Sequence, residues 1–138
     1  MPGAMPDDFL HLSRIGQIGV NAHDIERATA FYRDTLGMQH LFTVPDKMSF
    51  FDCDGVRLML SLPEGGPEFD YPTSVIYFKV DDILKAFQNL ELRGVRILEP
   101  PHLIARMGTH DLWMGFFKDS EDNVLSLMSE VPPAPVTL

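Results

Sequence analysis

The sequence contains a single cysteine, Cys53, among 138 residues. One cysteine cannot form a disulfide within the chain, and its place in a predicted strand is typical of a small buried hydrophobic residue. The longest apolar runs span only a few residues, and residues 1–12 lack the basic start and apolar block of a signal peptide. We therefore expect no membrane-spanning segment and a protein of the reducing cytoplasm.

Basic side chains are also scarce. Eleven lysines and arginines stand against twenty aspartates and glutamates, which gives a formal net charge of −9. A chain of this charge is repelled by phosphate backbones and by anionic lipid surfaces, so nucleic acids and membranes are excluded as expected partners. The sequence also lacks a glycine-rich phosphate loop, a CxxC pair and a Ser/His/Asp signature, so none of these common sites is predicted.

Hydrophobic residues make up 45% of the chain, which is enough for the core of one domain. The most informative segment runs from Asp24 to Met38 and directly follows a predicted strand over residues 15–20. Asp24 can cap a first helical turn, and Gly37 can end the last turn in the left-handed conformation. Between them, apolar residues recur at helical spacing: Ile25, Ala28, Tyr32 and Leu36.

A second copy of this pattern follows. Residues 74–80 are predicted to form a strand, and Asp82 is predicted to cap a second helix. Gly94 ends that helix before another strand over residues 95–98. The chain therefore repeats a strand–helix–strand unit.

Two further segments, residues 50–58 and 116–125, also match each other. Both read as strand, acidic turn and strand. Gly55 and Asn123 stand at the turn position that tolerates a positive φ. Each repeat is therefore completed by a hairpin.

Residues 14–62 and 73–130 thus each predict a βαβββ module. This duplication, with the sequence AFYRDTLGM at residues 30–38, resembles the vicinal oxygen chelate superfamily, which holds glyoxalase I, bleomycin-resistance proteins, methylmalonyl-CoA epimerase and extradiol dioxygenases. The resemblance implies an α+β fold in which two modules form an incompletely closed, eight-stranded, barrel-like sheet around a cleft, and it implies a homodimer. We expect one such domain over residues 14–130, with residues 1–13 as an arm and residues 131–138 as a tail.

The resemblance also implies where a metal would bind. Metal-using members take one ligand from the first and one from the last strand of each module, and these positions fall on Gln17, Met59, Val75 and Ser126. A slip of one residue would replace Met59 by Leu58 or Leu60. A divalent transition metal needs three or four nitrogen, oxygen or thiolate donors and compensating negative charge. One amide and one hydroxyl do not meet that need, so we predict no metal and no cofactor, and we disfavour reactions that depend on the metal.

A second candidate constellation is a predicted hairpin with strands over residues 103–106 and 111–115. A three-residue loop would pair Arg106 with His110 and bring His102 near Met114. The two imidazoles and the guanidinium could then form a binding or acid–base cluster. Local hydrogen bonding by each histidine is the plainer alternative, and an unrelated metal site is a third.

Large apolar side chains could line the cleft. Trp113, the only tryptophan, could be either a cleft wall or part of the core. Tyr77 shares a strand face with Val75 and could orient a ligand. Several methionines lie in or near predicted strands, where they could form an adaptable apolar pocket or fill the core: Met38, Met48, Met59, Met107, Met114 and Met128.

The sequence therefore predicts a metal-independent glyoxalase/bleomycin-resistance/dioxygenase-type protein that binds a small, partly apolar molecule in the sheet cleft. The expected ligand-binding residues are the polar anchors Gln17, Tyr77 and Ser126, the apolar walls Met59, Val75 and Trp113, and the charged contacts His102, Arg106 and His110. The alternative is an enzyme of the lyase, isomerase or dioxygenase type that uses a displaced metal site or the histidines. An interaction module without a ligand is the third possibility.

Overall fold

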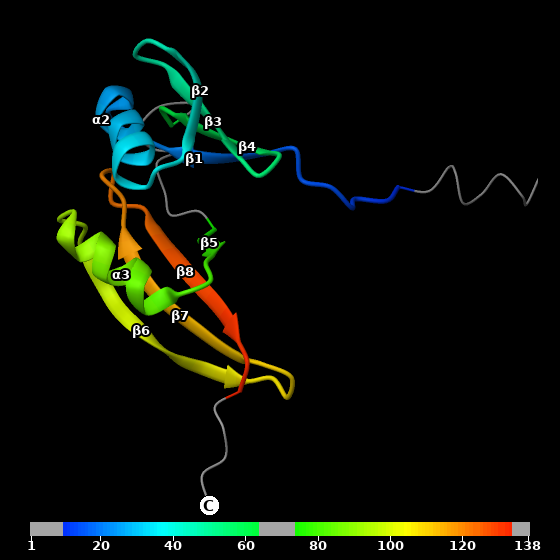
Figure 1. Ribbon diagram of the computed structural model, residues 1–138. Coiled ribbons are helices and arrows are strands. Elements are labelled where there is room, and N and C mark those ends of the chain that lie inside the picture. The colour runs from blue at the N-terminus through cyan, green and yellow to red at the C-terminus, as the bar shows by residue number, and fades with distance from the viewer. Residues whose placement is uncertain (1–9, 64–73, 134–138) are drawn as a thin grey trace, which may run out of the picture.

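The computed structural model describes residues 10–63 and 74–133 (Figure 1). Most of the predicted arm and tail lies outside these residues. The elements, in chain order, are β1 (Gln17–Asn21), α2 (Ile25–Ala30), η2 (Phe31–Thr35), β2 (Gln39–Val44), β3 (Met48–Cys53), β4 (Val56–Ser61), β5 (Ile76–Lys79), α3 (Ile83–Leu92), β6 (Ile97–Arg106), β7 (Asp111–Lys118) and β8 (Val124–Val131). None of the described helices is both long and apolar enough to cross a membrane.

The strands form two four-stranded sheets, in the orders β1-β4-β3-β2 and β5-β8-β7-β6. β1 runs parallel to its neighbour β4, and β5 runs parallel to its neighbour β8. The other neighbouring pairs are antiparallel. One helix segment covers one face of each sheet (Figure 1). The predicted α+β fold of two βαβββ modules is confirmed, and the described strands do not close a barrel.

The first helix begins and ends where the sequence predicts, but its last turn is wider than expected. The Asp24 side chain accepts a hydrogen bond from the Arg27 amide at 3.0 Å, and Gly37 has a φ of +71°. Residues 31–35 form a π-helical turn, in which the Leu36 amide reaches back to the Phe31 carbonyl. A π turn accommodates one extra residue within a helix, and helical spacing alone does not reveal it.

The second helix follows its prediction closely, but the strand after it does not. Asp82 accepts from the Lys85 amide at 3.1 Å, and Gly94 has a φ of +80°. The two strands predicted over residues 95–98 and 103–106 are one ten-residue edge strand, β6. Register shifts along the pairing of β6 with β7 accommodate the two prolines within β6. Sheets tolerate proline in edge strands and at such irregularities.

Two turns also differ from their predictions. Arg106 pairs with Asp111, and the Met107 amide bonds the His110 carbonyl, so the loop has one residue more than expected. In the turn before β8 the positive φ belongs to Asp122 and not to Asn123. Asx side chains tolerate this conformation almost equally, so the sequence does not decide between neighbours.

The core lies between each helix and the inner face of its own sheet. Its fully buried members include Tyr32, Phe51, Leu58 and Phe117. In the second module the helix approaches β7 so closely that a Cβ on Gly115 would stand 2.6 Å from the Phe87 ring. Glycine at this position therefore sets how closely α3 packs on its sheet.

The turn between β7 and β8 joins the second module to the first helix. Glu121 accepts hydrogen bonds from the backbone amides of His23 and Asp24 and from two nitrogens of Arg27, at 2.7–3.0 Å. Burial raises the pKa of Glu121, but the bonds from Arg27 and the two backbone amides outweigh it and hold that pKa at about 2. Glu121 therefore stays ionised and fixes the start of α2.

Candidate functional site

The strands β1 and β5 are edge strands of their sheets, and a groove of about 610 Å³ lies between them. Its walls include Gln17, Gly19, Val75 and Tyr77. Gly19 leaves room on its wall, because a Cβ there would meet only the Met59 methyl group, at 3.8 Å. The groove is therefore formed by one edge from each module.

The Gln17 side chain is held by two neighbours from β4. Its Nε2 lies 3.6 Å from the Met59 sulfur, and its Oε1 accepts a hydrogen bond from Arg57 Nε at 2.7 Å. Gln17, Val75 and Tyr77, all predicted as site residues, thus line this groove, and the predicted Met59 contacts Gln17 from β4.

Ser126 is the neighbour of Tyr77 in the sheet, but its hydroxyl does not reach the groove. The side chain is fully buried, and Oγ donates to the Gly115 carbonyl at 2.8 Å. On the same face, the ring of Tyr77 meets that of Phe116 edge to face, with centroids 6.0 Å apart. Ser126 therefore supports the strand that carries Tyr77, while Tyr77 itself stays 45% exposed.

The predicted histidine cluster does not assemble. His102 Nδ1 is 3.0 Å from the Pro100 carbonyl, and Arg106 lies 3.7 Å from the Asp111 carboxylate. His110 Nε2 lies 2.6 Å from Glu130 Oε2. Because the loop is longer and β6 changes register, the three side chains take separate partners.

Trp113 lies on the helix side of its sheet. It alternates along β7 with Met114 and shares its face with Gly115 and Phe117, and it packs against the core. Ser126 and Tyr77 occupy the other face. The structure therefore does not bring Trp113 to the groove, and strand alternation separates the two.

Sequence reasoning missed a row of side chains on the open face of the first sheet. Arg57 lies over the Phe50 ring at 5.4 Å, and the rings of Phe42 and Phe50 are 4.6 Å apart. They share the face of Gln17, because Gln17 pairs with Arg57 and Phe50 pairs with Met59. The alternation of Arg57 and Met59 with buried Leu58 and Leu60 in β4 was the available signal.

Comparison with known families agrees with this architecture. Residues 14–127 match the family described as the Glyoxalase/Bleomycin resistance protein/Dioxygenase superfamily. The chain belongs to this superfamily. A search of curated protein sequences found no match.

Solved structures show the same superfamily fold. A superfamily member from Sphaerobacter thermophilus DSM 20745 aligns with a TM-score of 0.71 and 24% identity, over 88% of this chain and 100% of that one. A glyoxalase-related enzyme from Fulvimarina pelagi gives 0.70 and 19%, over 86% and 88%. Lactoylglutathione lyase from Agrobacterium tumefaciens gives 0.67 and 20%, over 86% and 95%. At these identities the likeness concerns the fold.

The residues expected at the superfamily's metal-ligand positions do not fit a divalent metal. Gln17 offers one amide, already bonded on both sides, and Met59 offers a thioether. Val75 offers no donor, and the Ser126 hydroxyl is directed to a backbone carbonyl. Over residues 10–63 and 74–133, no group of three or more His, Cys, Asp or Glu residues could hold a metal ion. The donor set lacks both the number and the negative charge that such an ion needs.

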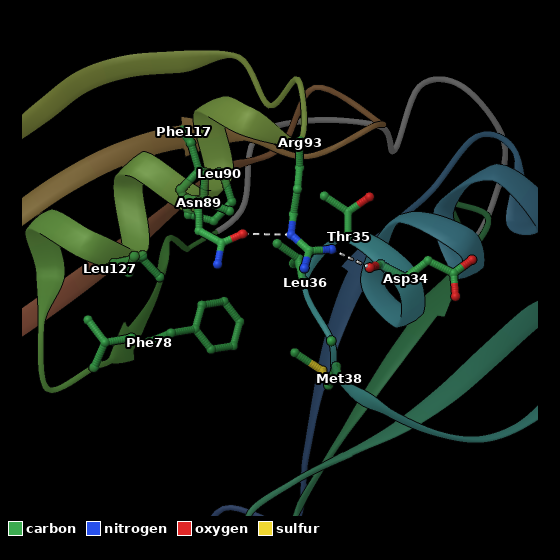
Figure 2. A pocket seen from close by; sticks show the side chains of 13 residues that line it. Asp34, Thr35, Leu36, Met38, Phe78, Asn89, Leu90, Arg93, Phe117 and Leu127 are labelled. Atoms are coloured by element: carbon green, nitrogen blue, oxygen red, sulfur yellow. Dashed lines mark hydrogen bonds between the residues drawn. The ribbon is translucent and has the colours of Figure 1, made fainter.

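A second cavity, of about 360 Å³, lies on the helix side of the molecule (Figure 2). It opens between the C-terminal end of η2 and the C-terminal half of α3, and Phe117 and Leu127 line it from the second sheet. Met38 was named among the methionines that could form an apolar pocket, but the other lining residues were not predicted as part of a site.

Proposed function

We propose that this superfamily member binds a small, partly apolar molecule in the groove between β1 and β5, without a metal ion. The observation that carries the proposal is that Gln17, Val75 and Tyr77 line one groove, with Met59 in contact with Gln17. Ligand sites commonly combine apolar walls with a few placed polar groups. This groove has that character, whereas its donors do not suit a cation.

The expected roles follow from chemistry. Met59 and Val75 give apolar contact, and the thioether adapts its shape to varied ligands. The exposed Tyr77 ring offers a flat surface and a hydroxyl. Gln17 and the neighbouring Arg57 supply hydrogen bonds, while the buried Ser126 lies beside Tyr77 on the adjacent strand.

We further propose that the protein works as a homodimer in the cytoplasm. Two edge strands border the groove, Tyr77 is about half exposed there, and Phe42 is about half exposed in β2 at the other edge of the first sheet, so association would cover apolar surface. Burial, followed by the charges of Asp52 and Asp54, raises the pKa of Cys53, so its thiol stays protonated and unreactive. Light scattering should give about twice the chain mass of 15.6 kDa. A concentration-independent value near 15.6 kDa would contradict the dimer.

The binding proposal can be tested by NMR of protein labelled with ¹³C-methyl methionine. The probes are three neutral aromatic compounds, indole, quinoline and 1-naphthol. At least one should shift the Met59 methyl signal saturably, and Met59→Leu assigns that signal. Gln17→Ala should weaken the binding, whereas Gln88→Ala on the exposed face of α3 should not. If no probe moves the Met59 signal, the groove is not a binding site.

A further inference from the structure

The cavity on the helix side has walls from both modules. Leu36 and Met38 come from the first module, and Phe78 and Leu90 come from the second. Figure 2 shows Met38 and Phe78 facing the same open space from opposite sides. A volume of about 360 Å³ with mostly apolar walls is within the range of small-molecule sites.

Two polar side chains stand together at one end of this space, Arg93 and Asn89 (Figure 2). Arg93 Nε donates to Asn89 Oδ1 at 2.7 Å, and Arg93 Nη1 donates to the Asp34 carbonyl at 3.1 Å. An arginine can only donate, so the Asn89 oxygen must face it, which leaves the Asn89 amino group on the cavity side. Figure 2 shows the remaining nitrogens of both side chains directed toward the space between Phe78 and Met38.

The polar groups of Arg93 and Asn89 that remain at this rim of the cavity are hydrogen-bond donors. The acceptor oxygen of Asn89 is already used by Arg93. The nearby carboxylate of Asp34 is held by Arg33 at 2.8 and 2.9 Å, and no carboxylate in the described part of the chain lies within 4 Å of the Arg93 guanidinium. A ligand must therefore bring acceptor atoms, and the unpaired cation favours negative charge. A carboxylate matches a guanidinium in both charge and shape.

This cavity is separate from the groove of the proposed function. Phe78 faces the cavity, whereas the preceding residue in β5, Tyr77, faces the groove. Likewise, Leu127 lines the cavity, and its neighbour Ser126 faces the opposite side of the sheet. The second sheet therefore lies between the two sites.

We propose that the cavity is a binding site for a small hydrophobic carboxylic acid, whose carboxylate bonds Arg93 and Asn89 and whose apolar body lies between Met38 and Phe78. Because the walls belong to both modules, a bound acid holds the modules together. It should therefore stabilise the native state by RT ln(1 + L/Kd), where L is the free concentration of the acid, and this term keeps rising with that concentration. The proposal does not depend on the function of the groove.

The test compares 4-phenylbutyrate with its neutral analogue 4-phenylbutan-1-ol, both titrated into protein labelled with ¹³C-methyl methionine. The acid should shift the Met38 methyl signal, assigned by Met38→Leu, and should leave the Met59 signal in place. It should bind about tenfold more tightly than the alcohol, because it adds hydrogen bonds to a charged group. Equal affinities, or a shift at Met59 alone, would overturn the proposal.

Arg93→Gln removes the charge from the rim, and the matched control Arg33→Gln removes the neighbouring charge that pairs with Asp34. Arg93→Gln should abolish the preference for the acid and leave the affinity for the alcohol within about twofold, and Arg33→Gln should change neither. A structural role alone would weaken both probes together. If Arg93→Gln does not fold by circular dichroism, Asn89→Asp serves instead, because its carboxylate should repel the acid and spare the alcohol. Unchanged preference in the folded variant refutes the site.

Discussion

The two modules share an element order, but their hairpin turns differ in length and in what they contact. In the first module the turn between β3 and β4 is short, with Asp54 and Gly55 both at positive φ. In the second, residues 119–123 form a longer turn that bonds the start of α2 through Glu121 and the buried Tyr32 through Asp119. Within the described residues, no hydrogen bond joins the first turn to α3 in return. Two duplicated modules can therefore be joined through the hairpin turn of only one of them.

The helices differ by one residue. Gly37 stands thirteen positions after Asp24, whereas Gly94 stands twelve positions after Asp82. The π turn over residues 31–35 takes up the difference, so both helices still end on a left-handed glycine. In this way both helices keep a capping aspartate and a terminal glycine, although the first is one residue longer.

The modules also distribute side-chain volume differently where a helix crosses its sheet. Phe87, five residues after its cap, packs on Gly115. The residue at the same distance from the first cap is Thr29, and Ser49 stands two residues before Phe51 as Gly115 does before Phe117. The second module therefore places a large side chain opposite a glycine, whereas the corresponding positions of the first module carry two small side chains.

The largest expected effect comes from removing the carboxylate that joins the modules. Glu121→Gln places an amino group toward Arg27 and removes the charge that holds it, so the free energy of unfolding should fall by about 3 kcal/mol. Chemical denaturation measures this loss. The matched change Glu26→Gln, on the exposed first turn of the same helix, should cost less than about 0.5 kcal/mol. Equal effects would show that the contact does not join the modules.

The same carboxylate predicts a dependence on pH. The pKa of Glu121 is lowered from its usual 4.5 to about 2 in the folded protein, so its stabilisation is present above pH 4.5 and is lost as the pH falls toward 2. The shift corresponds to about 3 kcal/mol. Between pH 6 and pH 2, the free energy of unfolding measured by chemical denaturation should therefore fall less steeply for Glu121→Gln than for the wild type. Parallel curves would contradict the assignment.

A smaller loss is expected where α3 packs on its sheet. Gly115→Ala forces a Cβ to within 2.6 Å of the Phe87 ring, and such overpacking costs about 2 kcal/mol. The control is Gly19→Ala in β1, where the new Cβ makes only an ordinary contact with Met59. Thermal unfolding of both variants measures the difference. A tolerated alanine at residue 115 would mean that α3 is free to move outward.

The smallest of these losses concerns the second bond of the long turn. Tyr32 donates to Asp119 at 2.7 Å, and both side chains are buried. Tyr32→Phe leaves Asp119 with its three remaining donors from Glu121 and Asn123, so we expect a loss of about 1–2 kcal/mol. Tyr77→Phe, at an exposed ring, should change stability by less than about 0.5 kcal/mol. If the two variants match, the buried bond contributes nothing.

Most of the fold follows from local signals that sequence carries well. Asp24, Gly37, Asp82 and Gly94 mark helix ends because capping and left-handed conformation depend on residue type. The length of β6 was not predictable in the same way. Its prolines read as a break, and only pairing with β7 in three dimensions shows that an edge strand continues through them.

The candidate site was predictable only in part, for a similar reason. Gln17, Met59, Val75 and Tyr77 follow from strand alternation together with the superfamily resemblance. The separate partners of the histidines depend on loop length and register, which a single sequence does not specify. The cavity beside Arg93 depends on how two modules pack, so no local pattern indicates it.

The most direct test of the proposed metal-independent site is elemental analysis after dialysis against micromolar zinc, nickel or manganese. The four ligand positions offer no carboxylate or imidazole, so the protein should retain well under one equivalent of metal, and its melting temperature should not rise. One equivalent of metal that is lost in Gln17→Ala but kept in Gln88→Ala would contradict the proposal.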